Sequence, residues 1–199
     1  MEEPNDKPGG EGEQEEEQQK KKLGSIKRGV ETMFRTSYRT HIELSGIADT
    51  KSNIMISING IIISIIIATL SPKLDSNPWL LWPSASLLFT TLLSIVYAIR
   101  AARPRVSREP VTLEDVRKNR ANILFFGNYH NMKKEEYVTG IEELMSDNER
   151  LYDTMARDLY GLGQVLARKF ELLRTAYNIF MVGMVISVAL FIGVFIWVS

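Results

Sequence analysis

Three stretches of the 199-residue chain contain no charged side chain, and they constrain the fold more than any other feature. They cover residues 52–72, 76–99 and 175–199, which are 21, 24 and 25 residues long. About 20 apolar residues in a helix cross the hydrocarbon core of a bilayer, which is ~30 Å thick. The sequence therefore predicts an all-α membrane protein with three transmembrane helices and argues against an ordinary soluble domain.

The net charge of zero conceals two opposite blocks at the N-terminal end. Residues 1–19 contain eight acidic side chains and one Lys, whereas residues 20–39 contain seven basic side chains and one acidic. A segment rich in Glu, Gln, Lys and Gly buries too little apolar area to offset its ordering entropy. We therefore expect residues 1–25 to form a disordered charged tail, with an interaction tail as the functional alternative.

The rest of the chain divides at its charged connections. Residues 26–99 are expected to form a cytoplasmic stalk helix followed by transmembrane helices 1 and 2. Residues 100–174 are expected to form a small cytoplasmic helical module with long helical extensions, and residues 175–199 the third transmembrane helix. Thr112, Asn131 and either Ser146 or Asp147 are candidate helix N-caps. No Pro follows Pro110, so one helix can run from about Asp147 to Trp197.

An apolar seam runs along the first half of that last helix. Its members recur at alternating steps of three and four residues, a spacing typical of a coiled-coil contact. They are Tyr152, Met155, Leu159, Leu162, Leu166, Leu173 and Ala176, with Lys169 as the one charged member. The seam predicts that this helix packs against another helix.

Basic residues next to the apolar stretches predict the orientation, because Lys and Arg near membrane ends favour the cytoplasmic side. They precede the first stretch, follow the second from Arg100 to Arg108, and precede the third up to Arg174. The short loop between the first two stretches carries only Lys73, beside Asp75. We therefore expect a multi-pass protein with a cytoplasmic N-terminus and an exported C-terminus.

Small and polar side chains form a stripe along the first apolar stretch. They step by three or four residues and so share one face of a helix; they are Asp49, Asn53, Ser57, Gly60 and Ser64. Such a stripe is typical of close helix packing, or it lines a pore when several subunits assemble. Asn59 lies off the stripe, and its amide needs a protein partner at membrane depth. Ser86, Thr90 and Ser94 form a similar face on the second stretch.

Motifs of catalysis and metal binding are not recognisable in the sequence. The chain contains no Cys and only two His residues, His41 and His130, which are far apart. It contains neither a phosphate-binding Gly-rich loop before Lys-Ser or Lys-Thr nor a Gly-x-Ser-x-Gly elbow. The acidic residues Asp115, Asp147, Asp153 and Asp158 lie in polar helical stretches and are expected on solvated faces. We therefore expect no catalytic residue, no metal, no cofactor and no nucleic-acid partner.

Several strings of residues resemble the transmembrane Pycsar effector family. The first half contains Glu31-Thr-Met-Phe-Arg-Thr, His41-x-x-Leu-Ser-x-x-Ala-Asp-x-Lys51 and Asn53-Ile-Met-Ile-Ser-x-Asn59. The second half contains Ile123-Leu-Phe-Phe-Gly-Asn-Tyr-His-Asn-Met and Leu162-Gly-x-Val-Leu-x-Arg-Lys-Phe. The resemblance covers about residues 26–198. In some relatives this membrane module follows an HD phosphohydrolase domain, whose His-Asp pair is missing here.

The resemblance implies a role in bacterial anti-phage defence. In Pycsar systems a pyrimidine cyclase makes cyclic UMP or cyclic CMP, and the effector then compromises the inner membrane, which causes abortive infection. The expected partners are the lipid bilayer, further copies of the chain and that cyclase. The basic residues expected to meet the phosphate of the nucleotide are Arg35, Arg39, Arg103, Arg105 and Arg168. Membrane topology and contact with anionic lipids also account for the arginines that follow the second stretch.

Two other classes of function fit the same sequence. One is a membrane scaffold whose cytoplasmic helices bind a protein partner through the seam or the Glu-rich tail. The other is a small channel that is unrelated to defence.

Overall fold

A computed structural model describes residues 10–73, 75–104 and 111–198, without the side chains of residues 10–15 and 71. Contacts divide the chain between Thr40 and His41, and the first long helix contributes to both units. No strand is present in these ranges, and three helices are long and apolar enough to cross a membrane. The predicted all-α fold with three transmembrane helices is thereby confirmed.

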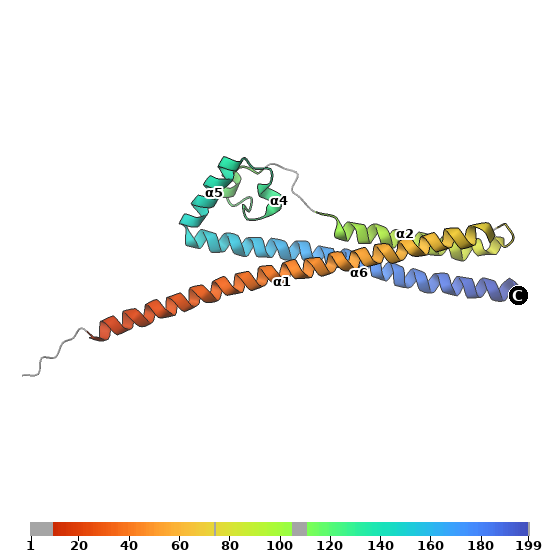
Figure 1. Ribbon diagram of the computed structural model, residues 1–199, viewed down its shortest axis with the longest axis horizontal. Coiled ribbons are helices and arrows are strands. Elements are labelled where there is room, and N and C mark those ends of the chain that lie inside the picture. Colours follow the sequence, from red (N-terminus) through yellow and green to blue (C-terminus); the bar gives the residue numbers. More distant parts are fainter. Residues whose placement is uncertain (1–9, 74, 105–110, 199) are drawn as a thin grey trace, which may run out of the picture. The chain divides into compact units, whose positions relative to one another are not determined.

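Two very long helices, joined by shorter elements, make up most of the chain (Figure 1). The first, α1, spans Gly10–Leu70, and the last, α6, spans Asn148–Val198. Between them lie the short 3-10 turns η1 (Ser71–Lys73) and η2 (Pro78–Leu80), followed by the helix α2 (Leu81–Ala102). The prediction of one continuous helix up to the end of the third span is confirmed.

The helix α1 begins earlier than the sequence indicated. Residues 10–25 were expected to be disordered, and the structure shows them as helical. Acidic and basic side chains four residues apart can stabilise an exposed helix of this kind. The Lys21 ammonium lies 2.8 Å from the Glu17 carboxylate, and that of Lys20 lies 3.6 Å from Glu16. Residues 1–9 of the expected tail lie outside the described residues.

Residues 111–147, here called the helical insert, form a small module between α2 and α6. It contains α3 (Leu113–Arg117), α4 (Phe126–Tyr129) and α5 (Lys134–Ser146). Its core is apolar: Ile123, Leu144 and Val116 are buried, and Ile123 is fully so. A Cβ on Gly140 would lie 2.5 Å from Cδ1 of Ile123, so the glycine lets α5 approach this side chain.

Two of the predicted helix caps in the insert are confirmed, and one is wrong. Thr112 and Asp115 form a reciprocal capping box at the start of α3. The carboxylate of Asp147 accepts hydrogen bonds from the backbone N–H groups of Glu149 and Arg150 at the start of α6. Asn131 does not cap α5, because that helix starts only at Lys134 and follows extended backbone at Lys133.

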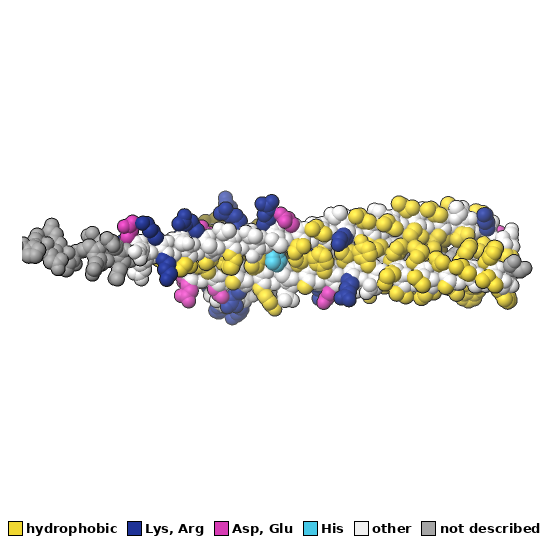
Figure 2. Space-filling model, turned by 90° about the horizontal axis from the view of Figure 1, so that it is seen from below, with side chains coloured by type: hydrophobic (Ala, Val, Ile, Leu, Met, Phe, Trp, Pro, Cys, Tyr) yellow, Lys and Arg dark blue, Asp and Glu magenta, His cyan; other side chains and the backbone are white. Residues whose placement is uncertain are grey.

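The membrane bundle consists of α2 and the parts of α1 and α6 that pack against it, residues 48–70 and 173–198. Figure 2 shows hydrophobic side chains over most of the visible surface of these spans. Many of the buried positions are small or polar, among them Ala98 and Ala176, which are fully buried, and few are large and apolar, such as Met55 and Ile66. Close helix packing through small residues is the usual solution in lipid, where apolar side chains gain little by leaving the bilayer.

Candidate functional site

A chain of hydrogen bonds connects the three helices in the middle of the bundle. The Asn59 amide donates to the Ser94 hydroxyl at 3.3 Å, and this hydroxyl donates to the backbone carbonyl of Ala176 at 3.0 Å. All three residues are fully buried. The Asn59 Oδ1 is also buried and has no hydrogen-bond partner among the described residues, which costs free energy. The partner that the sequence required for Asn59 is therefore Ser94 on α2.

The small polar face of α2 lies against α6, and the two helices run in opposite directions. Ser187 donates to Ser86 at 3.2 Å, and towards the other end Ser94 meets Ala176. Between these two contacts, a Cβ on Gly183 would lie 1.9 Å from the Cγ2 of Thr90. A hydrogen at position 183 is thus what allows the two helices to come this close.

A charged group connects α1 and α6 where the apolar spans begin. The Lys169 ammonium donates to both carboxylate oxygens of Asp49, at 2.8 and 2.9 Å, and to the Ser45 hydroxyl at 2.9 Å. The Lys169 side chain is only 15% exposed. Further from the spans, α1 and α6 are also close to each other, because a Cβ on Gly163 of α6 would lie 3.6 Å from the imidazole of His41 on α1. The one charged member of the apolar seam is therefore paired across the helix contact.

The polar stripe of the first span does not lie on the buried face of α1. The buried face is formed by Ala48, Ser52, Met55, Asn59 and Ile66. Of the stripe, Asn53, Ser57 and Ser64 are exposed in the single chain, Gly60 is half-buried, and Asp49 is bound to Lys169. The stripe therefore remains available for contact outside this chain's own bundle.

The arginines that were predicted to bind a ligand lie on three different elements. Arg35 and Arg39 are on α1, Arg103 caps the end of α2, and Arg168 is on α6; all four are exposed. The prediction for Arg105 lies outside the described residues. Arg168 lines a shallow hollow formed by α6 residues alone.

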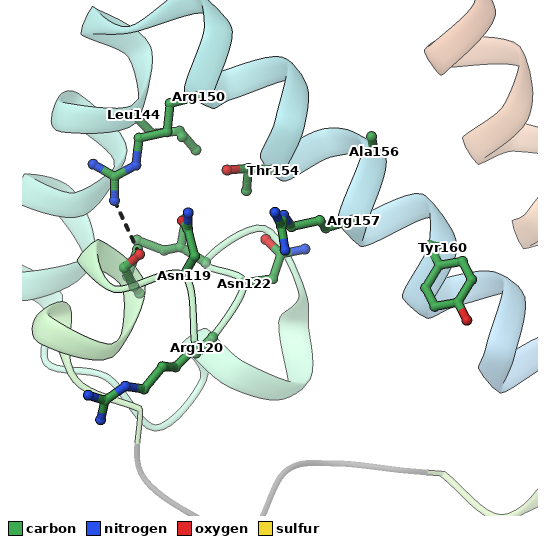
Figure 3. A pocket seen from close by; sticks show the side chains of 12 residues that line it. Asn119, Arg120, Asn122, Leu144, Arg150, Thr154, Ala156, Arg157 and Tyr160 are labelled. Atoms are coloured by element: carbon green, nitrogen blue, oxygen red, sulfur yellow. Dashed lines mark hydrogen bonds between the residues drawn. The ribbon is translucent and has the colours of Figure 1, made fainter.

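A larger pocket, of about 510 Å³, lies between the loop after α3 and the beginning of α6 (Figure 3). Its lining contains three arginines and no acidic residue. Asn119 and Asn122 from the loop face Thr154 and Arg157 from α6, whereas Arg120 points away from this group. The loop enters the pocket through Asn119, whose φ of 54° is left-handed, a conformation that Asn tolerates better than most residues.

Hydrogen bonds hold the walls of this pocket in place. The Asn122 side chain donates to the Asp158 carboxylate at 2.8 Å and accepts from the Leu124 backbone N–H at 2.9 Å. Arg150 donates to the backbone carbonyl of Val116 at 3.1 Å. These bonds attach the loop and α3 to α6, so the pocket has a defined shape.

Outside the spans, ion pairs and hydrogen bonds shift the pKa of three groups in the insert. The hydrogen bond from Arg117 lowers the pKa of the Glu143 carboxyl, and the same contact raises the pKa of Arg117. Hydrogen bonds from Thr112 lower the pKa of the Asp115 carboxyl. The contacts that cause these shifts stabilise the charged forms of the three side chains; Arg117 and Glu143 join α3 to α5, and Asp115 caps α3.

Neither the pocket nor the burial of one of its supports was predicted from the sequence. Asp158 was expected on a solvated face, but it is buried, with 6% of its surface exposed. One signal was present: Arg150, Thr154 and Arg157 are spaced by four and three residues, and so share a face of one helix. Within the described ranges, no group of three or more His, Asp or Glu side chains could hold a metal ion.

The geometry defines a class of protein: a helical membrane protein with three apolar spans and a helical insert ahead of the third. Residues 32–197 match the family described as the Pycsar effector protein domain, and the chain belongs to this family. The resemblance noted in the sequence is thereby confirmed. No curated protein and no solved structure matches the chain.

Proposed function

We propose that this protein is a Pycsar-type anti-phage effector of the bacterial inner membrane. A cyclic pyrimidine nucleotide, cyclic UMP or cyclic CMP, activates it, and it then impairs the membrane so that the infected cell dies. The observation that carries the proposal is the family match over residues 32–197, which includes all three apolar spans and the insert. The functional partner is the pyrimidine cyclase that supplies the nucleotide.

The proposed orientation places the N-terminus and the insert in the cytoplasm and the C-terminus on the exported side. Basic residues precede the first and third spans and follow the second, and Lys and Arg near membrane ends favour the cytoplasmic side, which supports this orientation. In this orientation the insert is exposed to a nucleotide made in the cytoplasm. The chain acts by binding and assembly, without chemistry of its own.

We further propose that the membrane is impaired by assembly of several copies through the polar stripe of α1. Asn53, Ser57 and Ser64 are exposed on the outer side of this helix, where a single copy leaves them facing lipid. Polar side chains at membrane depth are stabilised by partners or by water. A second copy supplies such partners, and a ring of copies would surround a polar path.

Membrane depolarisation in cells that express the protein tests this proposal. We expect depolarisation with added cyclic UMP or cyclic CMP and none without nucleotide. The double variant Asn53→Leu with Ser57→Leu should remain in the membrane and lose most of the depolarisation, because its stripe is apolar.

The matched control replaces two exposed apolar residues of the same helix, Ile54→Leu with Ile58→Leu, and should behave like the unaltered protein. Full depolarisation by the stripe variant would contradict the role of the stripe. If no nucleotide causes depolarisation of the unaltered protein, the effector function is wrong, and a membrane scaffold with a protein-binding module becomes the better interpretation.

A further inference from the structure

We propose that the pocket between the 119–123 loop and α6 binds a small organic phosphate, with its anionic group at Arg157 and Arg150. The inference rests on the proposed function for the choice of a pyrimidine nucleotide as the ligand. It assigns the binding site to the junction of the insert and α6, in place of the scattered arginines that the sequence indicated.

The charge of the pocket favours an anion. None of its twelve lining residues is acidic, and Arg150 and Arg157 lie beside its polar groups, whereas Arg120 points away and lies 3.8 Å from the Asp115 carboxylate. Arg157 uses its Nε to donate to Asp153, at 2.8 Å, and Arg150 uses one Nη to donate to the Val116 carbonyl. An arginine has five N–H donors in a planar fork, so a side chain held by one of them can still bind phosphate with the others.

The polar groups at the centre of the pocket suit the edge of a base or a ribose hydroxyl. Asn119, Asn122 and Thr154 lie around the same space as Arg157 (Figure 3). Amide side chains offer both donors and acceptors, which is what the edge of a pyrimidine requires. Because Asp158 and the Leu124 N–H fix the Asn122 side chain, its amide orientation is set before a ligand arrives.

The remaining walls are apolar and provide contact area. Ile123, Val116 and Leu144 form the floor shared with the core of the insert. The Tyr160 ring at the rim is 71% exposed and offers a flat surface on which a base can stack. A volume of about 510 Å³ lies within the range of small-molecule sites, roughly 300–1,000 Å³.

This location connects ligand binding directly to the membrane. Arg150, Thr154, Arg157 and Tyr160 all belong to α6, which continues without a break to Val198. The loop on the other side of the pocket belongs to the insert. A ligand with its phosphate on α6 and its base against Asn119 and Asn122 therefore holds the 119–123 loop to α6, and α6 carries that change towards Lys169 and the third span.

Calorimetric titration of the full-length protein tests the assignment. Detergent micelles without anionic lipid are used, so that no lipid headgroup can occupy the site. Cyclic CMP, cyclic UMP and inorganic phosphate are titrated separately. We expect one of the two nucleotides to bind, with phosphate competing weakly, and Arg157→Ala to lower the affinity about tenfold or more.

Two variants keep the test independent of folding. Tyr160→Ala removes an exposed ring, cannot disturb the core, and should also weaken nucleotide binding. Arg168→Ala is the matched control: it removes an exposed arginine of the same helix outside this pocket and should bind like the unaltered protein. Circular dichroism verifies the helix content of each variant.

The outcomes separate the two proposals. If the unaltered protein binds a nucleotide and both Arg157→Ala and Tyr160→Ala retain that affinity, the pocket is misassigned while the proposed function survives. Loss of binding in Arg168→Ala alone would likewise overturn the pocket in favour of the hollow at Arg168 on α6. If neither nucleotide binds the unaltered protein, the proposed ligand and the pocket assignment both fail.

Discussion

The membrane bundle and the helical insert both consist of helices without strands over the described residues, yet different side chains hold them together. Most buried contacts of the bundle are made by Ala, Gly, Ser, Thr and Asn, as at Gly183 against Thr90 and Asn59 against Ser94, beside a few large side chains such as Met55. The insert instead buries the branched side chains of Ile123, Leu144 and Val116. Burial from water drives the second kind of packing, whereas lipid gives large apolar side chains no such incentive.

The comparison explains why the exposed surface of the bundle is more apolar than its contacts. Ile61, Phe89 and Val185 are among the many large apolar residues that lie at least half exposed in the spans. In a soluble module such residues would form the core. The polar stripe of α1 differs from the surface around it, because exposed polar residues are the exception on a lipid-facing surface.

The largest expected effect is on the core of the insert. Ile123→Ala removes a fully buried side chain that packs on Gly140, so we expect the insert to lose about 2–5 kcal/mol of stability. Amide hydrogen exchange of residues 111–147 in the full-length protein measures the loss. Val138→Ala, at an exposed position of α5, is the control and should leave protection nearly unchanged. Equal protection in both variants would contradict the packing described for the insert.

A smaller effect is expected in the bundle, and it depends on position rather than on chemistry. Gly183→Val places a side chain where Thr90 already lies, so it should destabilise the α2–α6 contact by about 1–3 kcal/mol. Gly193→Val makes the same change on the same helix, in open space. Thermal unfolding in detergent should show a lower midpoint for the first variant only, and equal midpoints would place the helix contact elsewhere.

The smallest effect separates the two regions by pH. The lowered pKa values of Glu143 and Asp115 mean that their stabilising effect is complete above the ordinary carboxyl range, about 4, and is lost as the pH falls towards the lowered values. The protection of insert amides, corrected for the intrinsic exchange rate at each pH, should therefore fall on acidification, while the uncharged contacts around Ser94 and Gly183 stay protected. Glu143→Gln should remove part of this dependence, and a bundle that opens before the insert would contradict it.

Much of the fold follows from local patterns in the sequence. Uncharged length predicts the three spans, and the caps at Thr112 and Asp147 come from side chains that bind their own neighbouring backbone. The face of Ser86, Thr90 and Ser94 was predicted from its spacing of four residues, and it packs against α6. All these features depend on residues within a few turns of one another.

The candidate site depends on contacts between distant residues, which a single sequence does not reveal. Lys169 and Asp49 are 120 positions apart, and each alone is an ordinary charge at the end of a span. Asn59 and Asn53 have the same chemistry on one helix, but only the fold decides that the first is buried and the second exposed. The pocket forms only where a loop of the insert meets a face of α6, so the sequence of the loop alone, or of α6 alone, does not reveal the site.

The connection between α5 and α6 is a single residue, Asp147, whose carboxylate is bound to the first turn of α6. Because this connection is so short, a change in the angle between α5 and α6 acts at one end of a helix about 75 Å long. If α6 tilts by only about 5° about Asp147, its C-terminal end moves by about 6 Å, roughly the rise of one helical turn. Even a slight movement of the insert would therefore produce a displacement as large as the spacing between side chains in the membrane.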